Sequence, residues 1–224
     1  MREKLYMAEP AAQGIARNNM VDGQVRPNQV SDPRVIAAMR ALPREAFAPA
    51  GAVAYADTDI DLGQGRFLAS PLVTARLAQL VLARNPAEVL VVGAGSGYLA
   101  AVLSAGGARV VALEEDARLQ SGALAQYAPD VEAVCGPLAA GYPAGGPYDV
   151  IVIEGAVPEI PENFAAQLNA SGRIVTILAD GDEPAGLGRA VVAEAVGKGF
   201  VPVRVFDCTA RVLPSFRRVP AFNF

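Results

Sequence analysis

The chain has 224 residues, of which 52% are hydrophobic and 19% are charged, a composition typical of one globular domain with a sizeable core. Its formal net charge of −4 gives no broad basic field, which argues against a protein that grips nucleic acid. Because the sequence contains no histidine, it excludes Ser-His-Asp triads, histidine proton shuttles and His-ligated zinc sites.

The N-terminal residues and the cysteines indicate the compartment. Residues 1–19 contain no apolar run ahead of a small-residue cleavage site, and no later segment offers about 20 uninterrupted apolar residues. Cys135 and Cys208 stand alone in the sequence, so neither a disulfide framework nor a thiolate metal site is expected. We therefore expect a cytoplasmic protein with no membrane association and no bound metal.

The residues before Pro86 read as helices separated by turns. A helix is predicted over 32–39, where a cap residue and a proline precede apolar residues at helical spacing. Residues 43–65 carry Pro, Gly and Asp and read as turns with a short hairpin. A second helix is predicted over 70–84, opened by a serine cap and a proline.

After Pro86 the chain alternates short apolar runs with a helical stretch at 98–103, a pattern typical of a parallel sheet covered by helices on both faces. Strands are expected at 89–92, 109–113, 131–135, 148–153 and 173–178, with a last pair at 201–207 and 208–213 whose antiparallel pairing is left open. The sequence thus predicts one α/β domain, with a helical extension over 1–84 and a Rossmann-like core over 85–224.

The turn after the first strand has the sequence Gly-Ala-Gly-Ser-Gly, at residues 93–97. Residues without a Cβ allow a tight turn and a close approach of a ligand to the backbone. Glu114 ends the next strand, where its carboxylate would accept hydrogen bonds from ribose hydroxyls. Dinucleotide sites need a small residue at the sixth position of this motif, and here that position is Tyr98. The pattern therefore favours S-adenosylmethionine over NAD.

From about Val21 onward the chain resembles the protein-L-isoaspartate O-methyltransferase family. The segment AYADTDIDLGQG is similar to the family's AYxDxPLPIGxGQ, and VLVVGAGSGYLAAVL is similar to its VLEIGTGSGYQAAVLA. The resemblance implies a seven-stranded class I methyltransferase fold, S-adenosylmethionine as methyl donor with S-adenosylhomocysteine as product, and a protein or peptide carboxylate of damaged aspartyl residues as acceptor.

The resemblance also implies where the ligands bind. The expected donor-binding residues are Gly93, Ala94, Gly95, Ser96, Gly97, Glu114, Glu115, Gly136 and Pro137. The expected substrate-binding residues are Arg66, Phe67 and Leu68. A carboxylate is already ionised at neutral pH and the sulfonium methyl is already electrophilic, so transfer requires alignment and no general base.

Several departures from the family pattern fall near the expected acceptor. The family serine corresponds to Ala69, the family threonine corresponds to Phe67, and Ser70 is displaced by one position and also suits a helix cap. Glu154 is a carboxylate where the family has a small or hydroxyl residue, and it is a candidate catalytic group or an exposed loop residue.

One further departure falls where the donor is expected to bind. The family's GDG motif, whose acid lies near adenine, appears as Gly136, Pro137 and Leu138, so that polar contact is lost. The alternatives to isoaspartyl methylation are a methyltransferase with another acceptor, such as a small molecule, and a non-catalytic sensor or scaffold that binds S-adenosylmethionine.

Overall fold

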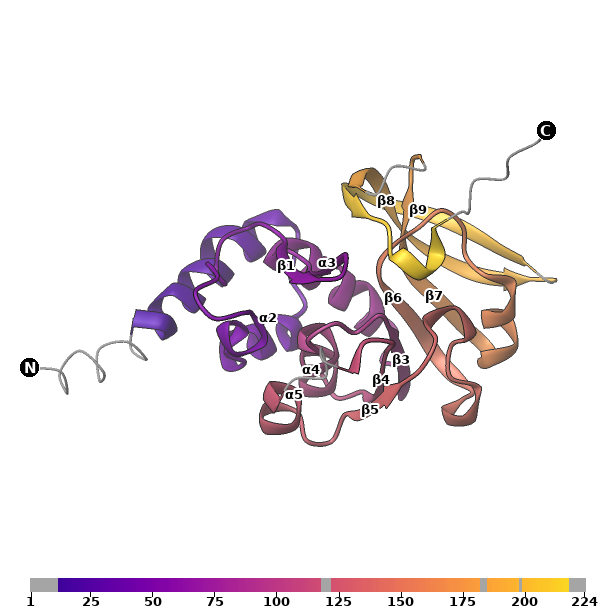
Figure 1. The fold of residues 1–224 in the computed structure, drawn as a ribbon, viewed down its shortest axis with the longest axis horizontal. Helices are drawn as coiled ribbons and strands as arrows, with labels where there is room; N and C mark the ends of the chain where they lie inside the picture. The colour runs from indigo at the N-terminus through magenta and orange to yellow at the C-terminus, as the bar shows by residue number, and fades with distance from the viewer. Residues whose placement is uncertain (1–11, 118–121, 182–184, 198, 218–224) are drawn as a thin grey trace, which may run out of the picture.

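The computed structural model describes residues 12–117, 122–181, 185–197 and 199–217. Its main sheet has seven strands, and the helices of the N-terminal half lie to one side of it (Figure 1). The strands are β3 (Glu88–Val92), β4 (Arg109–Glu114), β5 (Glu132–Cys135), β6 (Tyr148–Val157), β7 (Leu168–Ala179), β8 (Ala185–Val196) and β9 (Gly199–Arg211). Their order is β5-β4-β3-β6-β7-β8-β9, and β3 to β7 run parallel while β8 and β9 are antiparallel. The strand order reverses between β3 and β6, and such reversals form ligand crevices at the carboxyl ends of the strands.

α-Helices cover one face of this sheet. They are α2 (Pro33–Ala41), α3 (Pro71–Leu82), α4 (Tyr98–Ala105) and α5 (Gly122–Tyr127), and residues 12–20 are also helical. Short helical turns follow at η1 (Val21–Val25), η2 (Arg26–Asn28) and η3 (Arg44–Phe47). Val89 and Val91 of β3 pack with Leu77 of α3 and Leu99 of α4 in one buried cluster, as alternation along a strand requires.

The other face of the sheet is covered by short 3₁₀ helices. Helices therefore lie on both faces, but within the described residues the α-helices all lie on the first face. The 3₁₀ helices are η5 (Leu138–Ala140), η6 (Pro143–Gly145), η7 (Glu162–Gln167) and η8 (Pro214–Phe216). Leu90 and Val92 of β3 pack there against Leu138 and Phe164 in a second buried cluster.

Most of the predicted elements are confirmed, and one prediction is wrong. Helix 32–39 corresponds to α2 with its cap at Asp32, and helix 70–84 corresponds to α3 with its cap at Ser70. The predicted pair at 201–207 and 208–213 is instead one strand, β9, which pairs antiparallel with β8. We missed β8 because its Ala- and Gly-rich sequence has weak strand propensity, so its pairing with β7 and β9 decides its structure.

A hairpin outside the main sheet lies next to the helical face. Its strands are β1 (Ile60–Gly63) and β2 (Arg66–Leu68), so a hairpin forms as expected, but its second strand lies beyond the predicted range of 43–65. The main buried cluster includes residues from both 1–84 and 85–224, which is compatible with the predicted single domain. Among the helices of the described ranges, none is long and apolar enough to cross a membrane.

Candidate functional site

The glycine turn joins β3 to α4 at the strand-order reversal. Gly93, Gly95 and Gly97 have φ values of +77°, +55° and +90°, which side chains with a Cβ rarely adopt. The N–H groups of Gly93 and Ala94 donate to the carbonyl of Leu113, at 2.9 and 3.1 Å, and hold the turn against β4. All five residues of the turn, Ser96 included, are buried.

Glu114 ends β4 beside this turn, and its carboxylate already has four donors. Its Oε2 accepts from the backbone N–H of Gly95 and from Nη2 of Arg66, both at 2.7 Å. Its Oε1 accepts from the N–H groups of Glu115 and Asp116, at 2.9 and 3.2 Å. Since a carboxylate has about four acceptor positions, these bonds fill its capacity.

Arg66 extends from β2 of the hairpin over the glycine turn. Its side chain is only 3% exposed, and its Nη2 lies 3.0 Å from where a Cβ on Gly93 would stand. Its Nε and Nη1 are buried without a hydrogen-bond partner in the described residues. Arg66 thus covers the glycine turn in this structure, and the carboxylate of Glu114 has no acceptor position left while Arg66 is bound to it.

The other residues expected to bind the donor lie at the same end of the sheet. The N–H of Gly136 donates to the carbonyl of Glu114 at 3.1 Å, because β5 pairs with β4. Glu115 is exposed and accepts a hydrogen bond from the hydroxyl of Ser215. Pro137 is exposed and offers no N–H, so its contact with a base would be apolar.

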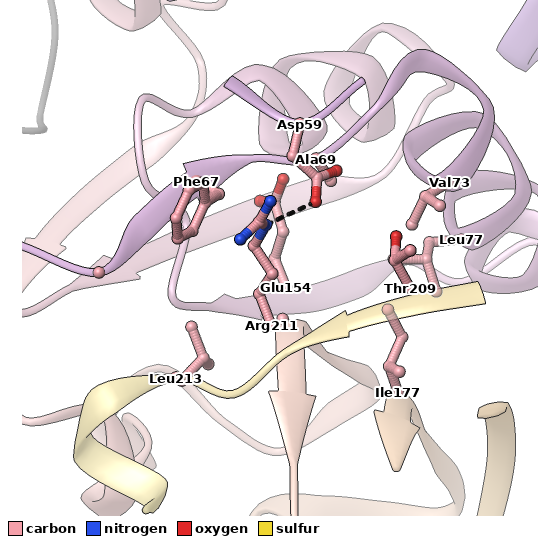
Figure 2. A pocket seen from close by; sticks show the side chains of 12 residues that line it. Asp59, Phe67, Ala69, Val73, Leu77, Glu154, Ile177, Thr209, Arg211 and Leu213 are labelled. Carbon is pink, nitrogen blue, oxygen red and sulfur yellow. Dashed lines mark hydrogen bonds and ion pairs between the residues drawn. The ribbon is translucent and has the colours of Figure 1, made fainter. Parts of the chain in front are cut away.

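A small cavity of about 40 Å³ is lined by side chains of the hairpin, of α3 and of strands β6, β7 and β9 (Figure 2). Arg211 of β9 pairs with Asp59, with Nε 2.9 Å from Oδ2, and its guanidinium carbon lies 4.1 Å from the ring centre of Phe67. This arrangement joins the C-terminal strand to the hairpin. The cavity is lined by Asp59, Gly65, Phe67, Ala69, Val73, Leu77, Glu154, Gly155, Ile177, Thr209, Arg211 and Leu213.

Glu154 is a buried residue of β6 that lines this cavity. Ile153 pairs with Val92, so Glu154 stands beside the start of the glycine turn. It is 7% exposed, and its Oε2 is buried with no hydrogen-bond partner in the part of the chain described. Burial raises the pKa of Glu154 to about 8, and Glu114 adds to this rise, while Arg66 and Arg44 oppose it. The interpretation of Glu154 as an exposed loop residue is therefore wrong.

Residues 68–70 belong to the segment that departs from the family pattern, and they have three different surroundings. Ala69 lines the cavity, and its carbonyl accepts from Nη2 of Arg44 at 2.5 Å. The hydroxyl of Ser70 accepts from the N–H of Val73 at 3.4 Å, as a helix cap does. Leu68 is 2% exposed and belongs to the main core, so its side chain does not face the cavity as a substrate-binding residue would.

Three residues of this region were not among the expected site residues. Asp59 lies in the segment expected to form turns, and its side chain is 13% exposed and accepts from Arg211 and from the N–H of Ser70. Arg44 is fully buried and donates to the carbonyls of Ala54 and Ala69. The sequence carries no local signal for Arg211, which reaches the site only through the folding of β9. No group of three metal-ligating side chains lies together in the described ranges.

Comparisons with known proteins agree with this architecture. The family model for protein-L-isoaspartate(D-aspartate) O-methyltransferase (PCMT) matches residues 16–185. A protein-L-isoaspartate O-methyltransferase of Rhodopseudomonas palustris is 38% identical over 162 residues, which cover 70% of this chain and 74% of the relative. One from Methanoregula boonei is 37% identical over 175 residues, covering 75% of this chain and 81% of the relative.

A solved structure agrees at the level of the fold. The crystal structure of a protein-L-isoaspartate O-methyltransferase from Plasmodium falciparum, in complex with S-adenosyl-L-homocysteine, superposes with a TM-score of 0.75 at 16% identity. The match covers 89% of this chain and 98% of that one. On the family match and the two relatives, this chain belongs to the protein-L-isoaspartate O-methyltransferase family.

Proposed function

We propose that this protein is an S-adenosylmethionine-dependent O-methyltransferase that methylates a carboxylate of isoaspartyl residues in proteins or peptides. The observation that carries the proposal is family membership over most of the chain, together with a buried glycine turn at the strand-order reversal. S-adenosylmethionine would supply an electrophilic methyl group. The chain would hold the acceptor carboxylate, orient it and exclude water.

The donor is expected to bind at residues 93–97 and Glu114, with Glu115, Gly136 and Pro137 towards the base. Binding in this mode requires Arg66 to give up Glu114, since the carboxylate has no acceptor position left for ribose. We propose that the acceptor enters the cavity between Phe67, Glu154 and Arg211, and that the protein acts in the cytoplasm.

The test is methyl transfer from labelled S-adenosylmethionine to an isoaspartyl peptide. The matched control is the same peptide with an ordinary aspartyl linkage. We expect label in the isoaspartyl peptide alone, released by mild base because the product is a methyl ester. Binding of S-adenosylhomocysteine without label in this peptide or in cell extract would instead identify a non-catalytic sensor or scaffold.

A methyltransferase with another acceptor is the second candidate. Ala69 has no hydroxyl, and the ring of Phe67 lies under Arg211 where the family has a threonine. Label that enters a component of cell extract, and not the isoaspartyl peptide, would support this candidate.

A further inference from the structure

The acceptor cavity contains a carboxyl group whose role neither the fold nor the donor site explains. Four polar side chains line the cavity, and two of them, Asp59 and Arg211, are paired with each other. The side chain of residue 69 is a methyl group and carries no hydrogen-bond donor. An acceptor carboxylate that enters here therefore takes its hydrogen bonds from the other lining side chains, among them Thr209, Arg211 and Glu154.

Glu154 can donate such a hydrogen bond only when it is protonated. A protonated carboxyl has one O–H donor, whereas an ionised carboxylate only accepts hydrogen bonds. Glu154 is 7% exposed, and no hydrogen-bond donor of the described residues reaches its Oε2. Burial without a direct ion pair favours the neutral form, and the raised pKa, about 8, agrees with this geometry.

The guanidiniums of Arg66 and Arg44 oppose protonation of Glu154, but both have other partners in this structure. Arg66 of β2 is already paired with Glu114 of β4, and Arg44 of η3 is committed to two backbone carbonyls. Asp59 balances Arg211 on the side of β9. An ionised Glu154 would give the cavity lining two carboxylates against one guanidinium, and this excess would repel an acceptor carboxylate.

We propose that protonated Glu154 donates a hydrogen bond to the acceptor carboxylate, in place of the hydroxyl that Ala69 lacks. The proposal rests on the proposed function, because it takes a carboxylate as the acceptor. One acceptor oxygen is held by Glu154 and the other is left to receive the methyl group. The proton stays on Glu154 throughout, so the step consumes no base. Hydrogen bonds between a carboxylic acid and a carboxylate are short and strong, which suits a specificity-determining contact.

The test is direct binding of a fluorescent isoaspartyl peptide between pH 6 and pH 9.5, with and without S-adenosylhomocysteine. Wild type is expected to bind with constant affinity at low pH and to lose affinity as pH rises through about 8. Glu154→Gln keeps an N–H donor and cannot ionise. We expect this variant to bind at pH 7 within about threefold of wild type and with no pH dependence above 7.

Two further variants complete the design. Glu154→Ala removes the donor and is expected to weaken binding at pH 7 by about tenfold or more. Glu162→Gln changes an exposed carboxylate outside the cavity and is the matched control, with binding and pH profile like wild type. Circular dichroism of each variant establishes that it is folded.

The outcomes separate this inference from the proposed function. If wild type binds and methylates the peptide but Glu154→Gln keeps the wild-type pH profile, or Glu154→Ala binds equally well, the role of Glu154 is refuted while the function stands. If wild type binds S-adenosylhomocysteine but no isoaspartyl peptide at any pH, the acceptor is wrong and the inference fails with it.

Discussion

The guanidinium of Arg66 and the carboxylate of Glu114 form a buried ion pair directly over the glycine turn, with Nη2 2.7 Å from Oε2. The side chains are 3% and 1% exposed. Of the four donors to Glu114, three are backbone N–H groups and Arg66 is a side chain. Arg66 is thus the donor that can leave without a change in the backbone.

Replacing Arg66 should strengthen binding of S-adenosylhomocysteine. Giving up a charge-assisted hydrogen bond costs about 1.5–3 kcal/mol, which corresponds to roughly ten- to a hundredfold in affinity. Arg66→Gln, measured by titration calorimetry, is expected to bind more tightly by a factor in this range. Arg84→Gln, at an exposed position, should bind like wild type. Weaker binding by folded Arg66→Gln would mean that Arg66 itself contacts the donor.

Breaking the same pair should destabilise the fold. Glu114→Ala leaves the guanidinium of Arg66 buried without a partner, and such changes lower the free energy of unfolding by about 3–5 kcal/mol. Replacing both residues by apolar ones, as in Arg66→Met with Glu114→Leu, should recover most of this loss. Urea denaturation measures both. A loss below about 1 kcal/mol for Glu114→Ala would show that the pair is solvated in solution.

Glu154 should make the stability of the protein fall with rising pH. Its pKa is raised from 4.5 to about 8, so between these values the folded state holds a proton that the unfolded state has released. Stability is therefore lost across that window as pH rises. The Tm of Glu154→Gln, minus that of wild type, should grow from pH 5 to pH 8 and then level off. A constant difference would contradict the burial of this carboxyl.

Ser70 should matter to stability and not to the reaction. Its hydroxyl caps α3, and removing a cap costs about 1 kcal/mol. Ser70→Ala is expected to unfold at lower urea concentration, and Ser70→Asp to retain the cap. Methyl transfer per folded molecule should be equal in all three proteins. A large loss of turnover in Ser70→Ala at full folding would assign Ser70 to the acceptor site.

The sequence predicted well what depends on local patterns. The glycine turn and the strands beside it follow one another in the chain, so apolar runs, punctuation and spacing were sufficient. The cap at Ser70 was likewise readable, because a cap acts within three residues.

What the sequence did not predict depends on contacts between distant residues. β8 is held by its neighbours, and Arg66 is buried because the hairpin packs on the glycine turn, 48 residues from its partner Glu114. The burial of Glu154 also depends on contacts with distant residues, because a carboxylate after a strand is usually solvated. The spacing of apolar residues along the sequence carries no information about such contacts.

The ion pair between Asp59 and Arg211 joins residues 152 positions apart, and this separation has a consequence for the order of folding. The glycine turn and Glu114 belong to one strand-helix-strand unit whose contacts are short-range. The acceptor cavity exists only after the last strand returns to the hairpin, and such long-range closures tend to be slow. A nascent or C-terminally truncated chain would thus complete the region for the donor while the region for the acceptor is still open.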